Sequence, residues 1–204
     1  MFALVQDNTI TKMISGNRGI TFGDIQYPRS IFSLWSASEK EAIGIYEVVF
    51  NNTNKKDEAY YTNTNQSFAF ADGVVTASFG SATAKLLEDR NEVDEDGEPL
   101  LDDNGDQVVT KGLKTLKKEI IKQQASGLLT PTDWYVIKAT DVESYSVPSA
   151  ITTYRANIRT ASNDMETIID NASDVDALAT LYNYTEQPDG THTRPLGEFP
   201  TLEV

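Results

Sequence analysis

The first third of the chain alternates short apolar and polar stretches in the manner of β-strands. Residues 2–14 and 67–79 each contain two β-prone runs around a two-residue turn, Asp-Asn in the first and Asp-Gly in the second. Such pairs tolerate the positive φ of the tight turns that join antiparallel strands. Both segments are therefore predicted to form β-hairpins. Phe68 and Phe70 lie two residues apart, so they share one face of their strand.

One short helix is predicted between these hairpins. Ser38 and Glu41 have the spacing of a capping box, in which each side chain bonds a backbone N–H near the other residue. Gly44 follows closely and is typical of a helix end. We therefore expect a single helical turn that stops before a strand over residues 45–50.

After Lys111 the apolar period changes from that of a strand to that of a helix. Lysines occupy one side of the segment and apolar residues the other, which predicts an amphipathic helix over residues 112–126, ending before Gly127. The apolar face consists of Leu113, Leu116, Ile120 and Ile121.

A second helix start follows almost at once. Thr130 is a favoured capping residue, Pro131 suits the first helical position, and Asp133 suits the positive end of the helix dipole. The side chains expected on the buried side of this helix are Trp134, Val136 and Ile137.

The clearest helical segment spans residues 148–171. Its apolar positions recur at alternating spacings of three and four, which is the pattern of a heptad seam. This seam consists of Ile151, Tyr154, Ile158, Ala161, Met165 and Ile168. Two interpretations stay open: the helix packs on its own domain, or part of the seam, flanked by Arg155 and Arg159, pairs with another subunit.

The sequence pattern changes again after residue 171. Ser173 and Asp174 are suited to cap one more short helix that runs through Leu181. Beyond Tyr184, proline and glycine recur, and the chain is expected to form an extended tail. Such a tail is either disordered or laid along a partner.

These elements predict an α+β protein, in which antiparallel hairpins or a small sheet precede a helical hairpin with one long helix and an extended tail. The predicted domains are a β-rich part at 1–80, an acidic linker or hairpin at 81–110, a helical part at 111–183 and the tail at 184–204.

Composition removes several classes of chemistry. The 204 residues include no cysteine and one histidine, His192, so thiolate metal sites, cysteine nucleophiles and multi-histidine sites are excluded. His192 lies in a stretch with turn chemistry and is expected at the surface. The net charge of −14 disfavours general nucleic-acid binding. No long apolar run predicts a membrane span, and the first residues lack the features of a signal peptide.

The acidic charge is concentrated in one segment. Ten of the 31 carboxylates lie between Glu88 and Asp106, against the single base Arg90, and a block of lysines follows from Lys111 to Lys122. A solvated acidic turn is the main expectation. The alternative is a poor match to a calcium loop around Gly97, with Glu92, Asp94, Asp96 and Asp103 as ligands. No metal or other cofactor is expected.

Two strings in the helical half resemble a known family. Leu-Leu-Thr-Pro-Thr-Asp-Trp at 128–134 and Tyr-Arg-Ala-Asn-Ile-Arg at 154–159 resemble the C-terminal region of bacteriophage tail-fibre assembly and tail-associated proteins. The first residues of the chain are similar, more loosely, to N-terminal regions of phage tail proteins. The resemblance marks five residues for the candidate site: Asp133, Trp134, Tyr154, Arg155 and Arg159. They either lock an antiparallel helix pair or present a surface to a fibre or baseplate subunit.

The resemblance implies a non-enzymatic structural component of a phage tail, at the baseplate or fibre attachment, made in the host cytoplasm and located in the virion. Its expected partners are other tail or fibre proteins, and a homo-oligomer is a further expectation. The alternative is a tail-fibre assembly chaperone that leaves before the particle is mature. An enzyme is disfavoured because no nucleophile is placed with a base.

Overall fold

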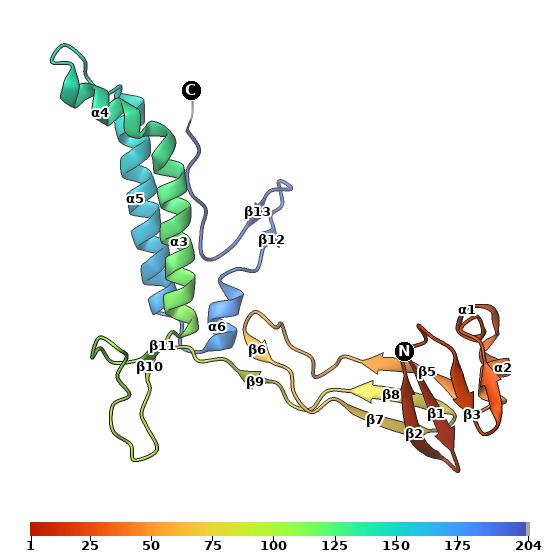
Figure 1. The fold of residues 1–204 in the computed structure, drawn as a ribbon. Coiled ribbons are helices and arrows are strands. Elements are labelled where there is room, and N and C mark those ends of the chain that lie inside the picture. The colour runs from red at the N-terminus through yellow and green to blue at the C-terminus, as the bar shows by residue number, and fades with distance from the viewer. Residues whose placement is uncertain (203–204) are drawn as a thin grey trace. The chain divides into compact units, whose positions relative to one another are not determined.

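The computed structural model describes residues 1–202 (Figure 1). Strands dominate the first part of the chain and helices the second, which confirms the predicted α+β class. The chain divides into two compact units, with the boundary between Thr83 and Ala84. None of the helices in the described part is long and apolar enough to span a membrane.

The first unit is built on a five-stranded sheet with the order β2-β1-β5-β8-β7. Its strands are β1 (Phe2–Gln6), β2 (Thr9–Ile14), β5 (Ile45–Asn51), β7 (Ser67–Ala71) and β8 (Val74–Ser78). Both predicted hairpins are present, β1 with β2 and β7 with β8. The parallel pairing of β5 with β8 joins them into one sheet, and the sequence did not predict it.

The turns of these hairpins explain the pairing. Asp7 and Asn8 have φ of 48° and 59°, and Asp72 and Gly73 have φ of 51° and 77°. Two successive residues with positive φ match the right-handed twist of the flanking strands. The residue types at the turns therefore set the register next to each turn. In the first hairpin an irregularity between Leu4 and Val5 then shifts the register.

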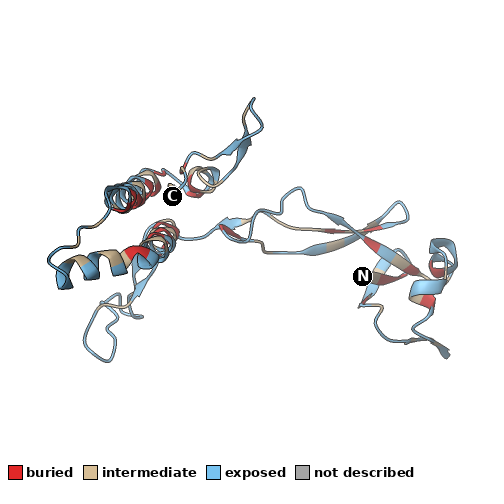
Figure 2. Cartoon of the chain, turned by 90° about the horizontal axis from the view of Figure 1, so that it is seen from above, coloured by how far each residue is buried: buried red, intermediate tan, exposed pale blue. Residues whose placement is uncertain are grey.

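Apolar side chains are buried on both faces of the sheet (Figure 2). One face buries Ala3, Val5, Val48, Val75 and Ala77, with Phe68 and Phe70 packed at its edge as their spacing predicted. The other buries Leu4, Ile14 and Ile45 beneath Ile31 of helix α1 (Ile31–Leu34).

The short helix α2 (Ala37–Glu41) begins earlier than predicted. Its capping box joins Ser36 and Glu39, so the predicted pair of Ser38 and Glu41 is wrong. Ser36 has the extended backbone of a capping residue. Two serines stand at the same spacing from a glutamate, and sequence alone does not separate them.

Two-stranded ribbons account for the remaining short strands. They are β3 (Ile20–Phe22) with β4 (Ile25–Tyr27), β6 (Tyr61–Thr62) with β9 (Thr83–Ala84), β10 (Arg90–Asn91) with β11 (Val109–Thr110), and β12 (Thr185–Glu186) with β13 (His192–Thr193). His192 is exposed, as predicted.

The acidic segment between β10 and β11 forms two similar tight turns in tandem. In each, one aspartate accepts two backbone N–H groups, Asp94 from residues 96 and 98 and Asp102 from residues 104 and 106. Gly97 and Gly105 occupy equivalent positions with φ of 85°. The segment is therefore a pair of exposed hairpin turns, which is one of the two forms predicted for it.

The strands of this segment meet in a closed ring of hydrogen bonds. The N–H of Glu92 donates to Val108, that of Val108 to Leu100, and that of Leu100 back to Glu92, at 2.8–3.0 Å. The side-chain Nε2 of Gln107 lies within 2.7–3.1 Å of the same three carbonyl oxygens. The polar backbone of a segment with little apolar core is satisfied in this way.

The second unit is a helical hairpin. Helix α3 (Leu113–Leu129) packs against α5 (Ser149–Asp170), and the two lie side by side along most of their length (Figure 1). A 3-10 turn at Thr130–Thr132 and helix α4 (Asp133–Asp141) connect them at one end. Helix α3 continues through Gly127, where the prediction ended it.

The seam of α5 was predicted correctly at first and then drifts out of phase. Ile151, Tyr154, Ile158 and Met165 are buried as predicted, but Ser162 and Ile169 replace Ala161 and Ile168. A straight α-helix has 3.6 residues per turn, so a strict heptad pattern slips by about 20° in each repeat. The seam packs inside this chain, as the first of its two interpretations proposed.

Three of the four lysines of α3 pair with acids of the same unit. Lys118 Nζ lies 2.7 Å from Asp170 Oδ1, and Lys122 Nζ lies 3.2 Å from Glu166 Oε2. Lys114 is buried, bonds the Asp170 carbonyl at 2.9 Å and pairs with Glu88. The basic block therefore ties α3 to its neighbours.

Helix α6 (Val175–Thr180) is capped by Asp174 as predicted. The part of the tail that the structure describes, residues 184–202, packs on the same unit. Leu196 is 1% exposed, and its N–H donates to the Leu181 carbonyl at 3.1 Å. Phe199 and Leu202 then pack on the cluster formed by Ala125, Tyr154 and Ile158. The tail therefore covers the helices of its own unit.

Candidate functional site

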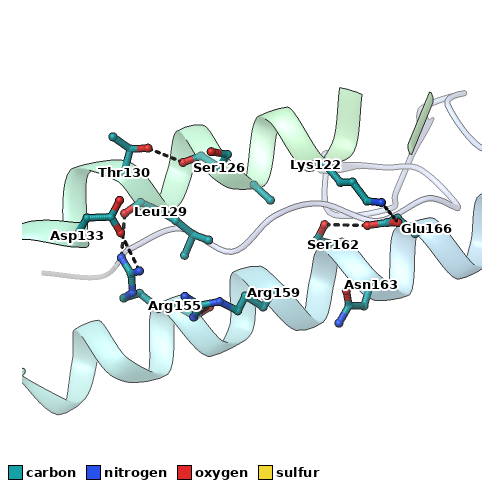
Figure 3. Close-up of a pocket in the computed structure, with 11 residues that line it drawn as sticks. Lys122, Ser126, Leu129, Thr130, Asp133, Arg155, Arg159, Ser162, Asn163 and Glu166 are labelled. Atoms are coloured by element: carbon teal, nitrogen blue, oxygen red, sulfur yellow. Dashed lines mark hydrogen bonds and ion pairs between the residues drawn. The ribbon is translucent and has the colours of Figure 1, made fainter. Parts of the chain in front are cut away.

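A groove of about 470 Å³ runs between α3 and α5 near their connected end (Figure 3). Small and polar side chains form most of its walls, with charged groups at intervals. It is lined by Lys122, Ala125, Ser126, Leu129, Thr130, Asp133, Arg155, Arg159, Ser162, Asn163 and Glu166. Three of the five residues marked by the family resemblance lie here, Asp133, Arg155 and Arg159.

Arg155 joins the two sides of the groove. Its Nη2 lies 2.8 Å from Asp133 Oδ1, and its Nη1 donates to the Leu129 carbonyl at 3.0 Å and to the hydroxyl of Thr132. The side chain is only 12% exposed. Thr132 in turn donates to the Leu129 carbonyl at 2.7 Å. A carbonyl at the end of α3, which has no partner within the helix, is satisfied by these two donors.

Arg159 has a different environment, although it lies one turn along the same helix. Its Nη1 donates to the Arg155 carbonyl at 3.3 Å, and its side chain is exposed. No carboxylate within residues 1–202 comes within 4.0 Å of it. Of the two arginines, Arg155 is therefore the one that holds Asp133.

The groove carries an excess of positive charge in an acidic protein. Asp133 offsets Arg155, and Glu166 offsets Lys122 while it also accepts a bond from Ser162 at 3.5 Å. The guanidinium of Arg159 is left as the cation without a paired acid among the described side chains. A carboxylate presented by another molecule would complete the same kind of pair that Asp133 makes with Arg155.

Trp134 was predicted to lie on the buried side of its helix, and this prediction is wrong. Its side chain is 49% exposed and its ring lies on Tyr135, with centroids 3.8 Å apart. Val136 and Ile137 are exposed as well. The reason is that α4 turns away from the end of the hairpin (Figure 1), so only its first residues reach α5. The apolar residues of α4 predicted that another element would cover this side of the helix. Within the described part of the unit, no element does so.

Tyr154 lies in the core and does not line this groove. It is buried beside Ala125 and Ile158, beneath the tail residues Phe199 and Leu202. Sequence reasoning found the arginines but missed Thr132, Lys122 and Glu166. The spacing within one helix gives no signal for a pair such as Lys122 and Glu166, which forms between two helices.

The acidic turns show no metal-binding arrangement. Within the described chain, no three Asp, Glu or His side chains are grouped closely enough to hold an ion. Asp94 is engaged by backbone N–H groups, and Glu92 by Arg90 at 2.8 Å. Hydrogen bonds from the backbone of Asp106 and Asn104 lower the pKa of Asp102. These carboxylates stabilise turns, and the structure offers no support for the calcium alternative.

Comparison with known proteins returns no match. The chain matches no protein-family model, no curated protein and no solved structure. The resemblance to phage tail-fibre assembly and tail-associated proteins, inferred from the sequence, therefore stays a prediction. The structure brings one residue from each string into contact, Asp133 from the first and Arg155 from the second.

Proposed function

We propose that this chain is a non-enzymatic structural component of a bacteriophage tail, located at the baseplate or the fibre attachment. In this proposal it binds a neighbouring subunit in the groove between α3 and α5. The observation that carries the proposal is the contrast between the two arginines. Arg155 connects α5 to the start of α4 through its ion pair with Asp133. The guanidinium of Arg159 lies in the same groove and has no carboxylate partner among the described residues.

The locked hairpin supports a binding role because a groove held open before binding loses little freedom when a partner arrives. Arg155 bonds three groups at the corner between α3 and α4, so the walls of the groove are fixed at that end. The partner group that fits Arg159 is an Asp or Glu side chain, because a guanidinium binds a carboxylate through two parallel hydrogen bonds.

The contents of the groove speak against catalysis. Its two carboxylates, Asp133 and Glu166, are each engaged by a cation. Ser126 and Ser162 supply hydroxyl groups, but Ser126 has no base beside it and Ser162 bonds the carboxylate that Lys122 holds. An activated nucleophile needs a base that is free to take its proton.

The assembly chaperone is a second candidate, and the packing of the tail favours it. A free tail would suit extended contacts within a particle, but this tail covers Tyr154 and Ile158 of its own unit. A helical unit whose tail is already packed, and which binds through one groove, suits a transient partner. The two candidates differ in whether the chain stays in the mature particle.

The groove is tested by replacing Arg159 with glutamate in a phage that depends on this chain for assembly. The proposal predicts that Arg159→Glu loses binding to the neighbouring tail or fibre subunit, because an acidic partner group would then meet a like charge. Arg29→Glu is the matched control, since Arg29 is also exposed but lies in the first unit. Equal binding by both variants would contradict a role for the groove.

A further inference from the structure

The exposed side of α4 carries a stripe that no other segment of residues 1–202 covers. Trp134, Ile137, Lys138 and Asp141 recur at helical spacing, so they follow one side of the helix, and all four are exposed. The half-buried positions of α4 are Asp133, Tyr135 and Ala139. A helix of nine residues without one buried side chain, carrying a tryptophan and an isoleucine at 49% and 60% exposure, is unusual for an isolated surface.

The two charged side chains of this stripe form no ion pair within residues 1–202. Lys138 and Asp141 are three residues apart, yet no ion pair joins them to each other or to another side chain in the described structure. The ammonium of Lys138 lies over the rings of Trp134 and Tyr145, at 5.9 and 4.3 Å from their centroids. The stripe therefore presents an apolar half, then a cation, then an anion, in that order along the helix.

We propose that this stripe is a contact between two copies of the chain, which pair their α4 helices antiparallel about a twofold axis. An isologous contact requires a surface that is complementary to itself. When the axis passes between Lys138 and Asp141, each Lys138 lies opposite Asp141 of the second copy. Helix α4 ends at Asp141, so in this register the two helices overlap from Lys138 to Asp141.

The second copy fits this stripe better than a lipid surface does. Asp141 and Glu143 are exposed at the end of α4 and would meet the negative headgroups of an anionic membrane. In the antiparallel pair the same Asp141 faces a cation. The stripe and the groove of Arg159 involve different side chains, so either proposal can fail while the other stands.

The test measures the oligomeric state of the full chain by sedimentation equilibrium over a range of concentrations. Wild-type protein is expected to dimerise. Lys138→Asp and Asp141→Lys each place like charges across the axis and should each weaken dimerisation at least tenfold. The double variant K138D/D141K restores the two symmetric pairs and should dimerise again.

A mixing experiment separates this register from any other. Lys138→Asp leaves two aspartates on the stripe, and Asp141→Lys leaves two lysines, so an equal mixture of the two variants should form a heterodimer although neither dimerises alone. Circular dichroism checks that each variant keeps its helices. A wild-type chain that stays monomeric up to its solubility limit would overturn the proposal, and so would a dimer that both single charge changes leave intact.

Discussion

Arg155 Nη2 and Asp133 Oδ1 lie 2.8 Å apart and connect the second turn of α5 to the start of α4. The pair is local in space but distant in sequence. It is shielded on the arginine side, where only 12% of the side chain is exposed, and open on the aspartate side. Two further bonds from Arg155 secure the carbonyl of Leu129 and the hydroxyl of Thr132. The arginine therefore organises the corner from which α4 departs.

This arrangement predicts unequal costs for the two arginines. Arg155→Met removes a shielded charge, leaves Asp133 without its donor and leaves Thr132 as the remaining side-chain donor to the Leu129 carbonyl. We therefore expect the free energy of unfolding to fall by about 2–4 kcal/mol. Arg159→Met removes an exposed group with one long bond and should change it by less than about 0.5 kcal/mol. Urea denaturation followed by circular dichroism measures both, and similar values for the two would contradict the assignment.

Trp134 and Ile158 provide a second comparison. Ile158 is fully buried, so Ile158→Ala should destabilise the protein by about 2–5 kcal/mol through lost burial and a cavity. Trp134→Ala removes a half-exposed ring and should cost less than about 1 kcal/mol. Thermal unfolding of the two variants distinguishes them. A large loss for Trp134→Ala alone, at a concentration where the chain is monomeric, would show that the ring is covered after all.

The tail yields a third prediction. Leu196 is 1% exposed although it lies in a stretch rich in proline and glycine. Leu196→Ala should lower the free energy of unfolding by about 2–5 kcal/mol, the range for a buried leucine. Val74→Ala, at an exposed apolar position, serves as the control and should cost little. If removal of Leu196 has no more effect than the control, the tail does not pack on its own unit.

The start of α3 gives a prediction for pH. Gly112 caps this helix and has no side chain, so the carboxylate of Asp89 accepts its N–H at 2.8 Å. This bond, with a second from Thr115, lowers the pKa of Asp89 below the ordinary value of 3.8. A lowered pKa in the folded state means that the stabilisation is present above that value and is lost as the pH falls through the folded pKa.

NMR titration of the Asp89 carboxyl carbon measures this pKa directly. Acid unfolding of Asp89→Asn should lack the contribution of this group, while Asp103→Asn, in the exposed turns, is the control. A pKa for Asp89 at or above 3.8 would contradict the capping role. Substitution of Gly112 itself is a poorer test, because a Cβ there would lie 2.3 Å from the backbone of Glu88.

Local sequence patterns predicted the local structure well. The Asp-Asn and Asp-Gly turns marked both hairpins, the helical period located α3 and α5, and the capping residues located α6. The errors arose where contacts distant in sequence decide the outcome. The parallel pairing of β5 with β8, the direction in which α4 leaves the hairpin and the packing of Leu196 all depend on such contacts.

The candidate site shows the same division. The spacing of Arg155 and Arg159 correctly placed them on neighbouring turns of one helix. It did not show that Arg155 would be shielded by the corner at Thr132 while Arg159 stayed open. That difference comes from where α3 ends, and α3 continued through Gly127 because a glycine inside a helix costs only about 1 kcal/mol.

The measurement that tests the central claim most directly is peptide mass spectrometry of purified mature particles of the source phage, with the major tail protein as the stoichiometric reference. A structural component of the tail should be present at a fixed low integer ratio to that reference, and the ratio should survive repeated purification. Absence from the particles, with the chain abundant in lysates of infected cells, would contradict the structural role and favour the assembly chaperone.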